Sequence, residues 1–503
     1  MPHRSREIIE EYTLEIISRS QAIQVRCNKL LAKDFASYAP RALSTTLMGM
    51  CYYLEEAAKA IYKQINWDSI TDDKLKSFLL LLQDTDTIIR ELGAHVRYVD
   101  GARTNRLPWS IIKPIEKFTK NLIPDRQIML RPQWKYNYSI VTTDLRQAYY
   151  DSIKEYQDYL PDISLNDKVL KDFKLPFHIV SFPSLERKNI LLHCLISHEI
   201  GHLISRTYFS KSRVDEFLKN ARNEIDVIVR NTFSKDPDNL FVQYQIQTQI
   251  QQEIERANFA WQRGLEEILS DIIGALLFGP AMLFSALEIA IQYDIDCIPS
   301  SKNNYYPPWR LRLREILKIL LDSSEEFFPL PKSIFISEKI IESVNKRFAL
   351  IKDITQKEND KEAIHNDPIL KLAYREIDKD ISQSIPRFKV DEQIKKSIIK
   401  SSDLYRSLPH LIERIDNGIP PNAYENTIND RKHAELVEII NAAWFHKIAW
   451  EDNIFNSDGS FNKDICKKRD ILNRLTLKAI EYADIEKEYR EKIGKPDKYE
   501  VDK

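Results

Sequence analysis

The stretch that decides how this chain is interpreted is Leu191 to Ser205, LLHCLISHEIGHLIS. Its leucines and isoleucines recur at the three- and four-residue spacing of an amphipathic helix. On a helix, residues four positions apart lie one above the other. His198 and His202 therefore present their imidazoles on one face, and Glu199 lies one position further round. The stretch predicts a helix that carries two candidate ligands for a single metal ion.

The order His-Glu-x-x-His suits zinc chemistry. A catalytic zinc ion with three protein ligands keeps one position for water, and it lowers the pKa of that water to about 7. A glutamate beside the first histidine can hold and deprotonate the water, and this is the role expected of Glu199. A five-residue pattern also arises by chance, so the interpretation depends on a second element.

That second element is Gly264 to Ala281, GLEEILSDIIGALLFGPA. Glu267 and Asp271 are four residues apart, so they share one face of a second predicted helix. Glu267 can supply the third ligand that a two-histidine site needs, and Asp271 can accept the free ring N–H of a ligand histidine. Glu266 stands next to Glu267 and is an alternative third ligand, although the spacing to Asp271 favours Glu267.

The two stretches together resemble the gluzincin class of zinc metallopeptidases, in which H-E-x-x-H is followed by E-x-x-x-D on a later helix. The resemblance implies that His198, His202 and Glu267 are zinc ligands. It also implies that Glu199 is the general base and that Asp271 orients a ligand histidine. It covers these two helices and, at most, the strand before them, and it does not extend over the whole chain.

A further similarity lies in the apolar run Leu276-Leu277-Phe278-Gly279-Pro280. ImmA/IrrE-type bacterial metallopeptidases close the helix of the third ligand with Leu-Leu-x-Pro, and this chain has one more residue before the proline. The similarity favours an intracellular regulatory protease, which cuts one or a few cellular proteins, over an enzyme of bulk digestion.

Peptide hydrolysis also needs a donor for the developing oxyanion. The segment from Asn303 to Arg314, NNYYPPWRLRLR, offers Tyr305, Tyr306, Arg310 and Arg312. Tyr306 and Arg312 are the two that we assign to catalysis. For any one of these residues, ordinary packing or solvent exposure is the competing interpretation.

The expected fold is predominantly α with a small β-sheet, an α+β zincin-like core between helical N- and C-terminal regions. Only 10 glycines occur in 503 residues, and helix-forming residues are abundant. The predicted divisions are a helical region 1–122, a catalytic core 123–325 with a helical insertion 210–263, and a helical region 326–503. The insertion is either a solvated helical hairpin or an arm that covers the cleft and binds a protein partner.

Inside the predicted core, residues 128–130 and 134–141 have the composition of two strands or a hairpin. Residues 143–160 predict a helix, and residues 177–182, closed by Pro183, predict a further strand. In zincin folds a sheet of this kind pairs its edge strand with an extended peptide substrate. An exposed edge offers its N–H and C=O groups to a peptide backbone.

Charge and composition narrow the function classes. The 74 basic and 75 acidic residues balance to a net charge of −1, so neither nucleic acid nor an anionic membrane is an expected partner. The five cysteines are scattered and form no C-x-x-C pair, which fits a reducing cytoplasm. The apolar run 272–287 is shorter than the ~20 residues of a membrane span, and we expect it to continue the ligand helix with a break at Pro280.

These observations predict a cytoplasmic zinc metallopeptidase that hydrolyses peptide or protein substrates through a metal-activated water. Two alternatives stay open. In one, a zincin-like core serves as a regulatory binding module, although such a module has no need for the general base Glu199. In the other, the chain is an all-helical scaffold without catalysis, and the His-Glu-x-x-His pattern is a coincidence.

Overall fold

The computed structural model describes residues 2–105, 109–124, 126–145, 176–208, 210–232, 240–293, 295, 306–322, 326–331, 334, 336–356, 367–427, 430–451, 460, 462 and 464–493. The chain divides into two compact units, Met1–Arg187 and Lys188–Lys503. The described residues are predominantly helical and include one three-stranded and one two-stranded sheet. The prediction of a predominantly α fold with a small β-sheet is therefore confirmed.

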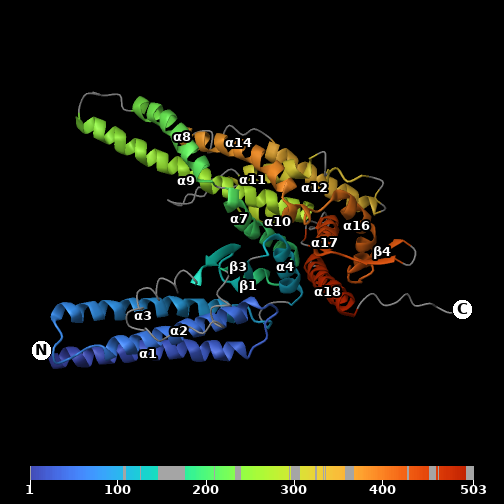
Figure 1. The fold of residues 1–503 in the computed structure, drawn as a ribbon. Coiled ribbons are helices and arrows are strands. Elements are labelled where there is room, and N and C mark those ends of the chain that lie inside the picture. The colour runs from blue at the N-terminus through green and yellow to red at the C-terminus, as the bar shows by residue number, and fades with distance from the viewer. Residues whose placement is uncertain are drawn as a thin grey trace. The chain divides into compact units, whose positions relative to one another are not determined.

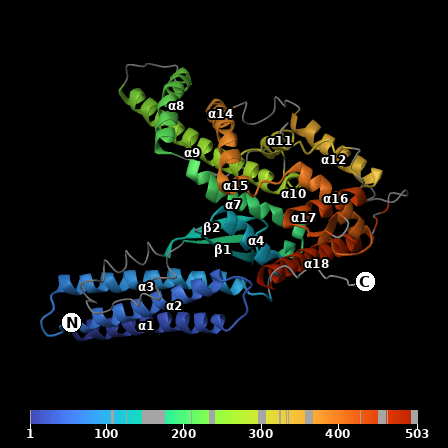
Figure 2. The same cartoon turned by 45° about the vertical axis from the view of Figure 1, so that its right-hand side comes forward.

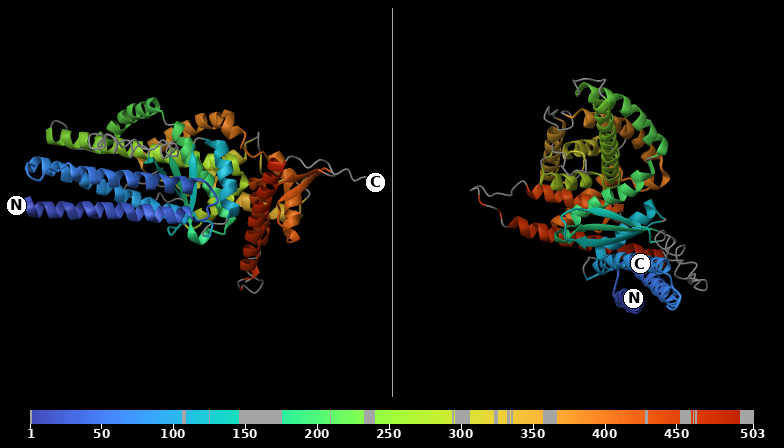
Figure 3. Two further views of the ribbon diagram at one scale, coloured as in Figure 1. Left: turned by 60° about the horizontal axis from the view of Figure 1, so that its bottom comes forward. Right: turned by 90° about the vertical axis from the view of Figure 1, so that its left-hand side faces the viewer.

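The described part of the first unit contains four helices and a sheet. In chain order its elements are α1 (Pro2–Leu31), α2 (Ala39–Lys63), α3 (Asp72–Gly101), α4 (Trp109–Leu122), β1 (Gln127–Gln133), β2 (Ser139–Thr143) and β3 (Phe177–Pro183). Helices α1, α2 and α3 run alongside one another (Figures 1 and 3). Apolar residues at helical spacing, such as Leu43, Leu47 and Leu54 of α2, are buried between them.

The sheet of the first unit has the order β1-β3-β2. Strand β1 pairs with β3 in parallel, and β2 pairs with β3 in antiparallel orientation. Strands are present near the predicted ranges, but the second begins at Ser139 and not at Trp134. The first two do not form a hairpin, because β3 lies between them. All seven residues of β3 are buried. Placing this strand between β1 and β2 buries it along both edges, and this outweighs a direct pairing of β1 with β2. Pro132 continues β1, which is an edge strand and tolerates a missing N–H. The helix predicted at 143–160 lies almost wholly outside the described residues.

The second unit is almost entirely helical. Its first half contains, in chain order, α7 (Ile196–Ser205), α8 (Lys211–Thr232), α9 (Leu240–Phe278), α10 (Pro280–Ala290) and α11 (Trp309–Leu320). Its second half contains α12 (Glu338–Gln356), α14 (Pro368–Val390), α15 (Glu392–Lys395), α16 (Ser401–Asp416), β4 (Ala423–Thr427), β5 (Asp430–His433), α17 (Leu436–Glu451) and α18 (Asp464–Ile493). Two short 3₁₀ turns, at Ile190–Leu195 and Arg206–Tyr208, complete the described elements of this unit, and a third, at Ser184–Glu186, follows β3 in the first unit.

Helix α9 is the long axis of the second unit, with 39 residues. The sequence suggested one helix at 241–254 and another from Gly264, but the structure joins them. Gly264 does not break the helix because Ile377 of α14 packs over it, 2.7 Å from where a Cβ would lie. The helix ends at Gly279, whose φ of +58° suits glycine, and Pro280 begins α10. The predicted break at Pro280 is confirmed.

The predicted insertion forms an arm, which is α8 packed against the first half of α9 (Figure 2). Helix α14 crosses α9 and also contacts α8. The arm is thus anchored by a helix that follows it by more than a hundred residues. Its role as a lid or partner-binding element stays a prediction.

Two predicted helices of the C-terminal region begin later than expected. The sequence pattern favours one helix from Pro331 and another from Arg431, but α12 begins at Glu338 and α17 begins at Leu436, after the β4–β5 hairpin. The residues of β4 and β5 pair with one another in antiparallel orientation, and this pairing takes precedence over helix. Among the described residues, none of the helices combines the length and apolar content that crossing a membrane requires.

Candidate metal centre

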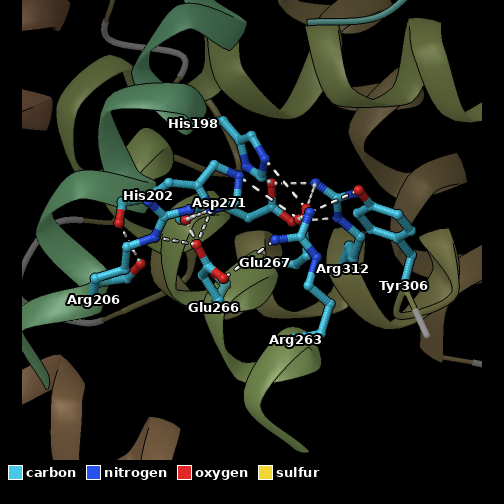
Figure 4. A network of polar contacts seen from close by, with 11 residues as sticks. His198, His202, Arg206, Arg263, Glu266, Glu267, Asp271, Tyr306 and Arg312 are labelled. Carbon is cyan, nitrogen blue, oxygen red and sulfur yellow. Dashed lines mark hydrogen bonds and ion pairs between the residues drawn. The ribbon is translucent and has the colours of Figure 1, made fainter. Parts of the chain in front are cut away.

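The two motif helices, α7 and α9, approach each other closely at Gly201. A Cβ on Gly201 would lie 2.7 Å from the Cα of Ser270 on α9, which is closer than any side chain permits. Glycine at this position therefore allows the two backbones to meet. The contact places His198 and His202 of α7 opposite Glu267 of α9 (Figure 4).

The imidazoles of His198 and His202 both direct their Nε2 atoms toward the Glu267 carboxylate. His198 Nε2 lies 3.3 Å from Glu267 Oε2, and His202 Nε2 lies 3.7 Å from Glu267 Oε1. All three residues are buried, and their ligand atoms lie within 4.8 Å of one another. Of the His, Cys, Asp and Glu side chains in the described residues, these form the one group of three or more with such spacing. The group could hold a metal ion.

The other ring nitrogen of each histidine faces a second carboxylate. His198 Nδ1 lies 2.8 Å from Asp271 Oδ1, and His202 Nδ1 lies 3.1 Å from Glu266 Oε1. Outer carboxylates of this kind hold the ring orientation and keep the proton on Nδ1, so that Nε2 carries the lone pair. Asp271 thus lies beside a histidine, as its spacing suggested. Glu266, the alternative third ligand, lies on the side of His202 that faces away from Glu267.

Two arginines neutralise the carboxylates of Asp271 and Glu267. Arg312 of α11 donates from Nε to Asp271 Oδ2 at 2.6 Å and from Nη2 to Oδ1 at 2.9 Å, and its Nη2 lies 3.5 Å from Glu267 Oε2. Arg263, one turn before Glu267 on α9, lies 3.2 Å from Glu267 Oε1 and donates to the hydroxyl of Tyr306 at 2.7 Å. Figure 4 shows these groups around one point.

The residues expected to stabilise an oxyanion differ in where they lie. Arg312 and Tyr306 are both at the site, but the guanidinium of Arg312 is paired with carboxylates and the hydroxyl of Tyr306 accepts from Arg263. Arg310 donates to the main-chain oxygen of Ile354 on α12. Tyr305 lies outside the described residues. Their catalytic roles stay predictions.

Burial and charge act on the protonation of the site in the metal-free protein. Burial opposes a charged imidazole, but the carboxylates of Asp271 and Glu267 outweigh it and raise the pKa of His198 to about 10. Burial favours the neutral form of Asp271 and of Glu267, but the charges of His198 and Arg312 outweigh it. They hold the pKa of both carboxylates below their usual values. Burial raises the pKa of Glu199, which His198 and His202 lower only in part.

The donor set fits a divalent transition metal. Two imidazoles and one carboxylate are the protein ligands of catalytic zinc in several hydrolases, and they leave a coordination position free. The surrounding carboxylates and arginines hold each donor in place before any metal binds. Imidazole and carboxylate also accept other divalent ions, so the donor atoms do not by themselves select zinc.

Several residues of the site were missed by inspection of the sequence. Arg263 lies four residues before Glu267, and Arg206 lies four residues after His202, so helical spacing alone could have found both. Arg206 donates to Glu266 at 2.8 Å. Tyr374 of α14, by contrast, has no local signal, because it joins the site from a helix more than a hundred residues further along the chain.

Comparison with known proteins adds no assignment. No protein-family model, no curated protein and no solved structure matches this chain.

Proposed function

We propose that this chain is a zinc-dependent metallopeptidase of the gluzincin type, acting in the cytoplasm on peptide or protein substrates. One observation carries the proposal. Two histidines turn their Nε2 atoms toward one buried glutamate, while a separate carboxylate holds each Nδ1 atom. Two helices that met by chance would not be expected to bring together both the three candidate ligands and the carboxylates of Asp271 and Glu266 behind the histidines.

The residues around this group suit hydrolysis. A bound zinc ion supplies a Lewis acid that activates water and polarises a carbonyl. Glu199 is next to His198, and its pKa is raised by burial, which moves it toward the range useful for proton transfer at neutral pH. It takes a proton from the attacking water and passes it to the leaving amine. A binding module does not require such a base.

A cytoplasmic location is supported by the cysteines. Among the described residues, Cys27, Cys51 and Cys194 are buried free thiols and Cys466 is an exposed one. Free thiols are typical of a reducing compartment.

The decisive experiment measures zinc in purified protein by plasma mass spectrometry. Wild type is expected to hold one zinc per chain, and His202→Ala and Glu267→Ala to hold none. Glu266→Ala is the matched control, because it removes the adjacent carboxylate that only supports His202, and it keeps zinc with about a 10- to 100-fold loss of affinity. Wild type that takes up no zinc after reconstitution contradicts the proposal and favours the scaffold.

A second measurement separates the enzyme from the binding module. Glu199→Gln keeps its zinc but is expected to lose about 10²- to 10⁴-fold of its peptidase rate, the usual contribution of a general base. The readout is cleavage of a mixed peptide library followed by mass spectrometry. A wild type that binds zinc and cleaves no more than Glu199→Gln contradicts the catalytic proposal.

A further inference from the structure

Tyr374 carries a buried hydroxyl that the fold leaves without a hydrogen bond. The residue is 5% exposed, and its hydroxyl oxygen has no hydrogen-bond partner among the described residues. Burying an unpaired polar group costs about 1–3 kcal/mol, so such groups are uncommon and call for a reason. A phenylalanine would fill the same space without this cost.

The position of Tyr374 points to the reason. Its Cε1 and hydroxyl oxygen lie 3.5 Å and 3.6 Å from where a Cβ on Gly264 would stand. Gly264 precedes Glu267 by three residues, so both are on one face of α9. The tyrosine ring therefore lies within van der Waals distance of the Gly264 position, beside the metal-ligand face, whereas Ile377 takes up the space that a side chain on Gly264 would need.

Charged groups near Tyr374 belong to the candidate metal centre. Burial raises the pKa of its phenol, and the charges that act on it are those of Arg312 and Glu267. A phenol in this environment stays protonated at neutral pH, so it keeps a proton to donate. The side chain at position 374 need not bring a positive charge, because Arg263 and Arg312 already neutralise the carboxylates of Glu267 and Asp271.

Helix α14, which carries Tyr374, is held firmly against the arm. Arg213 of α8 donates to Asp380 Oδ1 at 2.7 Å and to Glu376 Oε2 at 3.1 Å. Trp261 of α9 donates to Asp380 Oδ2 at 2.8 Å. These contacts lie less than two turns from Tyr374 on α14, so the ring is fixed by its own helix.

We infer that Tyr374 is a substrate-binding residue of the proposed active site, and that its hydroxyl donates a hydrogen bond to the carbonyl oxygen of the bond to be cleaved. The inference rests on the proposed function. Of the other two oxyanion candidates at the site, Arg312 is paired with Asp271, and the hydroxyl of Tyr306 accepts from Arg263 but keeps its own proton to donate. A substrate carbonyl would satisfy the hydroxyl of Tyr374, which the described residues leave without a partner.

The test uses Tyr374→Phe in the full-length chain, with acetohydroxamate as a small zinc ligand that presents a carbonyl oxygen. Binding to zinc-loaded protein is followed by calorimetry, and unfolding of the metal-free protein is followed by circular dichroism. The control is Tyr405→Phe, because the hydroxyl of Tyr405 donates to the main-chain oxygen of Phe327 at 2.7 Å, away from the site.

Tyr374→Phe is expected to weaken acetohydroxamate binding about 10- to 100-fold, the cost of a lost hydrogen bond to a charged ligand. Its zinc content is expected to equal that of wild type, and its metal-free melting temperature to be unchanged or higher, because no internal hydrogen bond is lost. Tyr405→Phe is expected to do the reverse, with a lower melting temperature and unchanged binding.

Equal acetohydroxamate affinity in wild type and Tyr374→Phe overturns the inference and leaves the proposed function intact. A melting temperature that falls as far as in Tyr405→Phe also overturns it, because the hydroxyl then has a structural partner. Wild type that binds no zinc, or zinc-loaded wild type that binds no acetohydroxamate, contradicts the proposed function and the inference with it.

Discussion

Two clusters in the second unit have nearly the same composition, and only one of them includes histidines. In the first, which we call the arm joint, Arg213 lies over the ring of Trp261 at 5.5 Å and pairs with Glu376 and Asp380. In the second, the metal centre, Arg312 lies over a tryptophan ring at 4.2 Å and pairs with two carboxylates. Each cluster is therefore built on an arginine, a tryptophan and two acids.

The difference lies in what the carboxylates face. In the arm joint, N–H donors of Arg213, Trp261 and Lys379 meet the oxygens of Asp380 and Glu376. The two carboxylates accept these hydrogen bonds and so join α8, α9 and α14.

In the metal centre, Glu267 faces two Nε2 atoms whose Nδ1 atoms are already held by other carboxylates. A metal ion bound here would take the place of the proton that His198 carries in the metal-free protein, and each Nε2 atom would then offer a lone pair toward Glu267. An arginine–acid cluster is therefore a joint where the carboxylates face only N–H donors, and a candidate metal site where a carboxylate and two imidazole Nε2 atoms converge.

Removing the arginines should give the largest effects and should separate the two clusters. Arg213→Ala and Arg312→Ala each remove the guanidinium from a pair of buried carboxylates, and breaking a buried ion pair in this way costs about 3–5 kcal/mol in free energy of unfolding. Zinc is expected to restore much of the loss in Arg312→Ala, because its charge replaces that of the guanidinium beside Glu267, and none of the loss in Arg213→Ala. Urea unfolding with and without zinc measures both. Equal recovery in the two variants would remove the distinction.

Neutralising one acid in each cluster sharpens the comparison. Asp271→Asn keeps the shape of the side chain but weakens its hold on His198, and the zinc affinity is expected to fall about 10- to 100-fold. Asp380→Asn is the matched variant in the arm joint, and it should lower stability while the zinc affinity stays as in wild type. Competition with a chromophoric chelator measures both affinities. A similar loss of affinity in Asp380→Asn would show that the joint is part of the site.

The smallest effect concerns acid. Burial opposes the charge of Glu376, but hydrogen bonds from Lys379 and Arg213 outweigh it and hold its pKa below the usual value. A lowered pKa in the folded state gives stability that is present above the unfolded pKa, about pH 4.5. This stability is lost as the pH falls from there through the folded value. Metal-free Glu376→Gln should lack this part of the acid dependence, which urea unfolding at a series of pH values measures. If the stability of Glu376→Gln depended on pH as that of wild type does, the stability lost in acid would come from other carboxylates.

The sequence alone determined the parts of the site that lie within one helix. Four-residue spacing places His198 above His202, and it places Glu267 above Asp271, whatever the rest of the chain does. Gly279-Pro280 likewise determined the end of α9, because no helix continues through that pair. The predominance of helix followed from composition, because helix propensity also depends on the local sequence.

Only the tertiary structure decided how these parts combine. Nothing local shows that Gly201 lets α7 meet α9 at Ser270, which puts Glu267 on the Nε2 side of the histidines and Glu266 on the Nδ1 side. The order of the sheet, with β3 in the middle, depends on pairing across a long stretch of chain. Tyr374 reaches the ligand face because α14 packs on α9. Spacing along a helix is set by backbone geometry, whereas contacts between distant segments are set by which surfaces can be buried together.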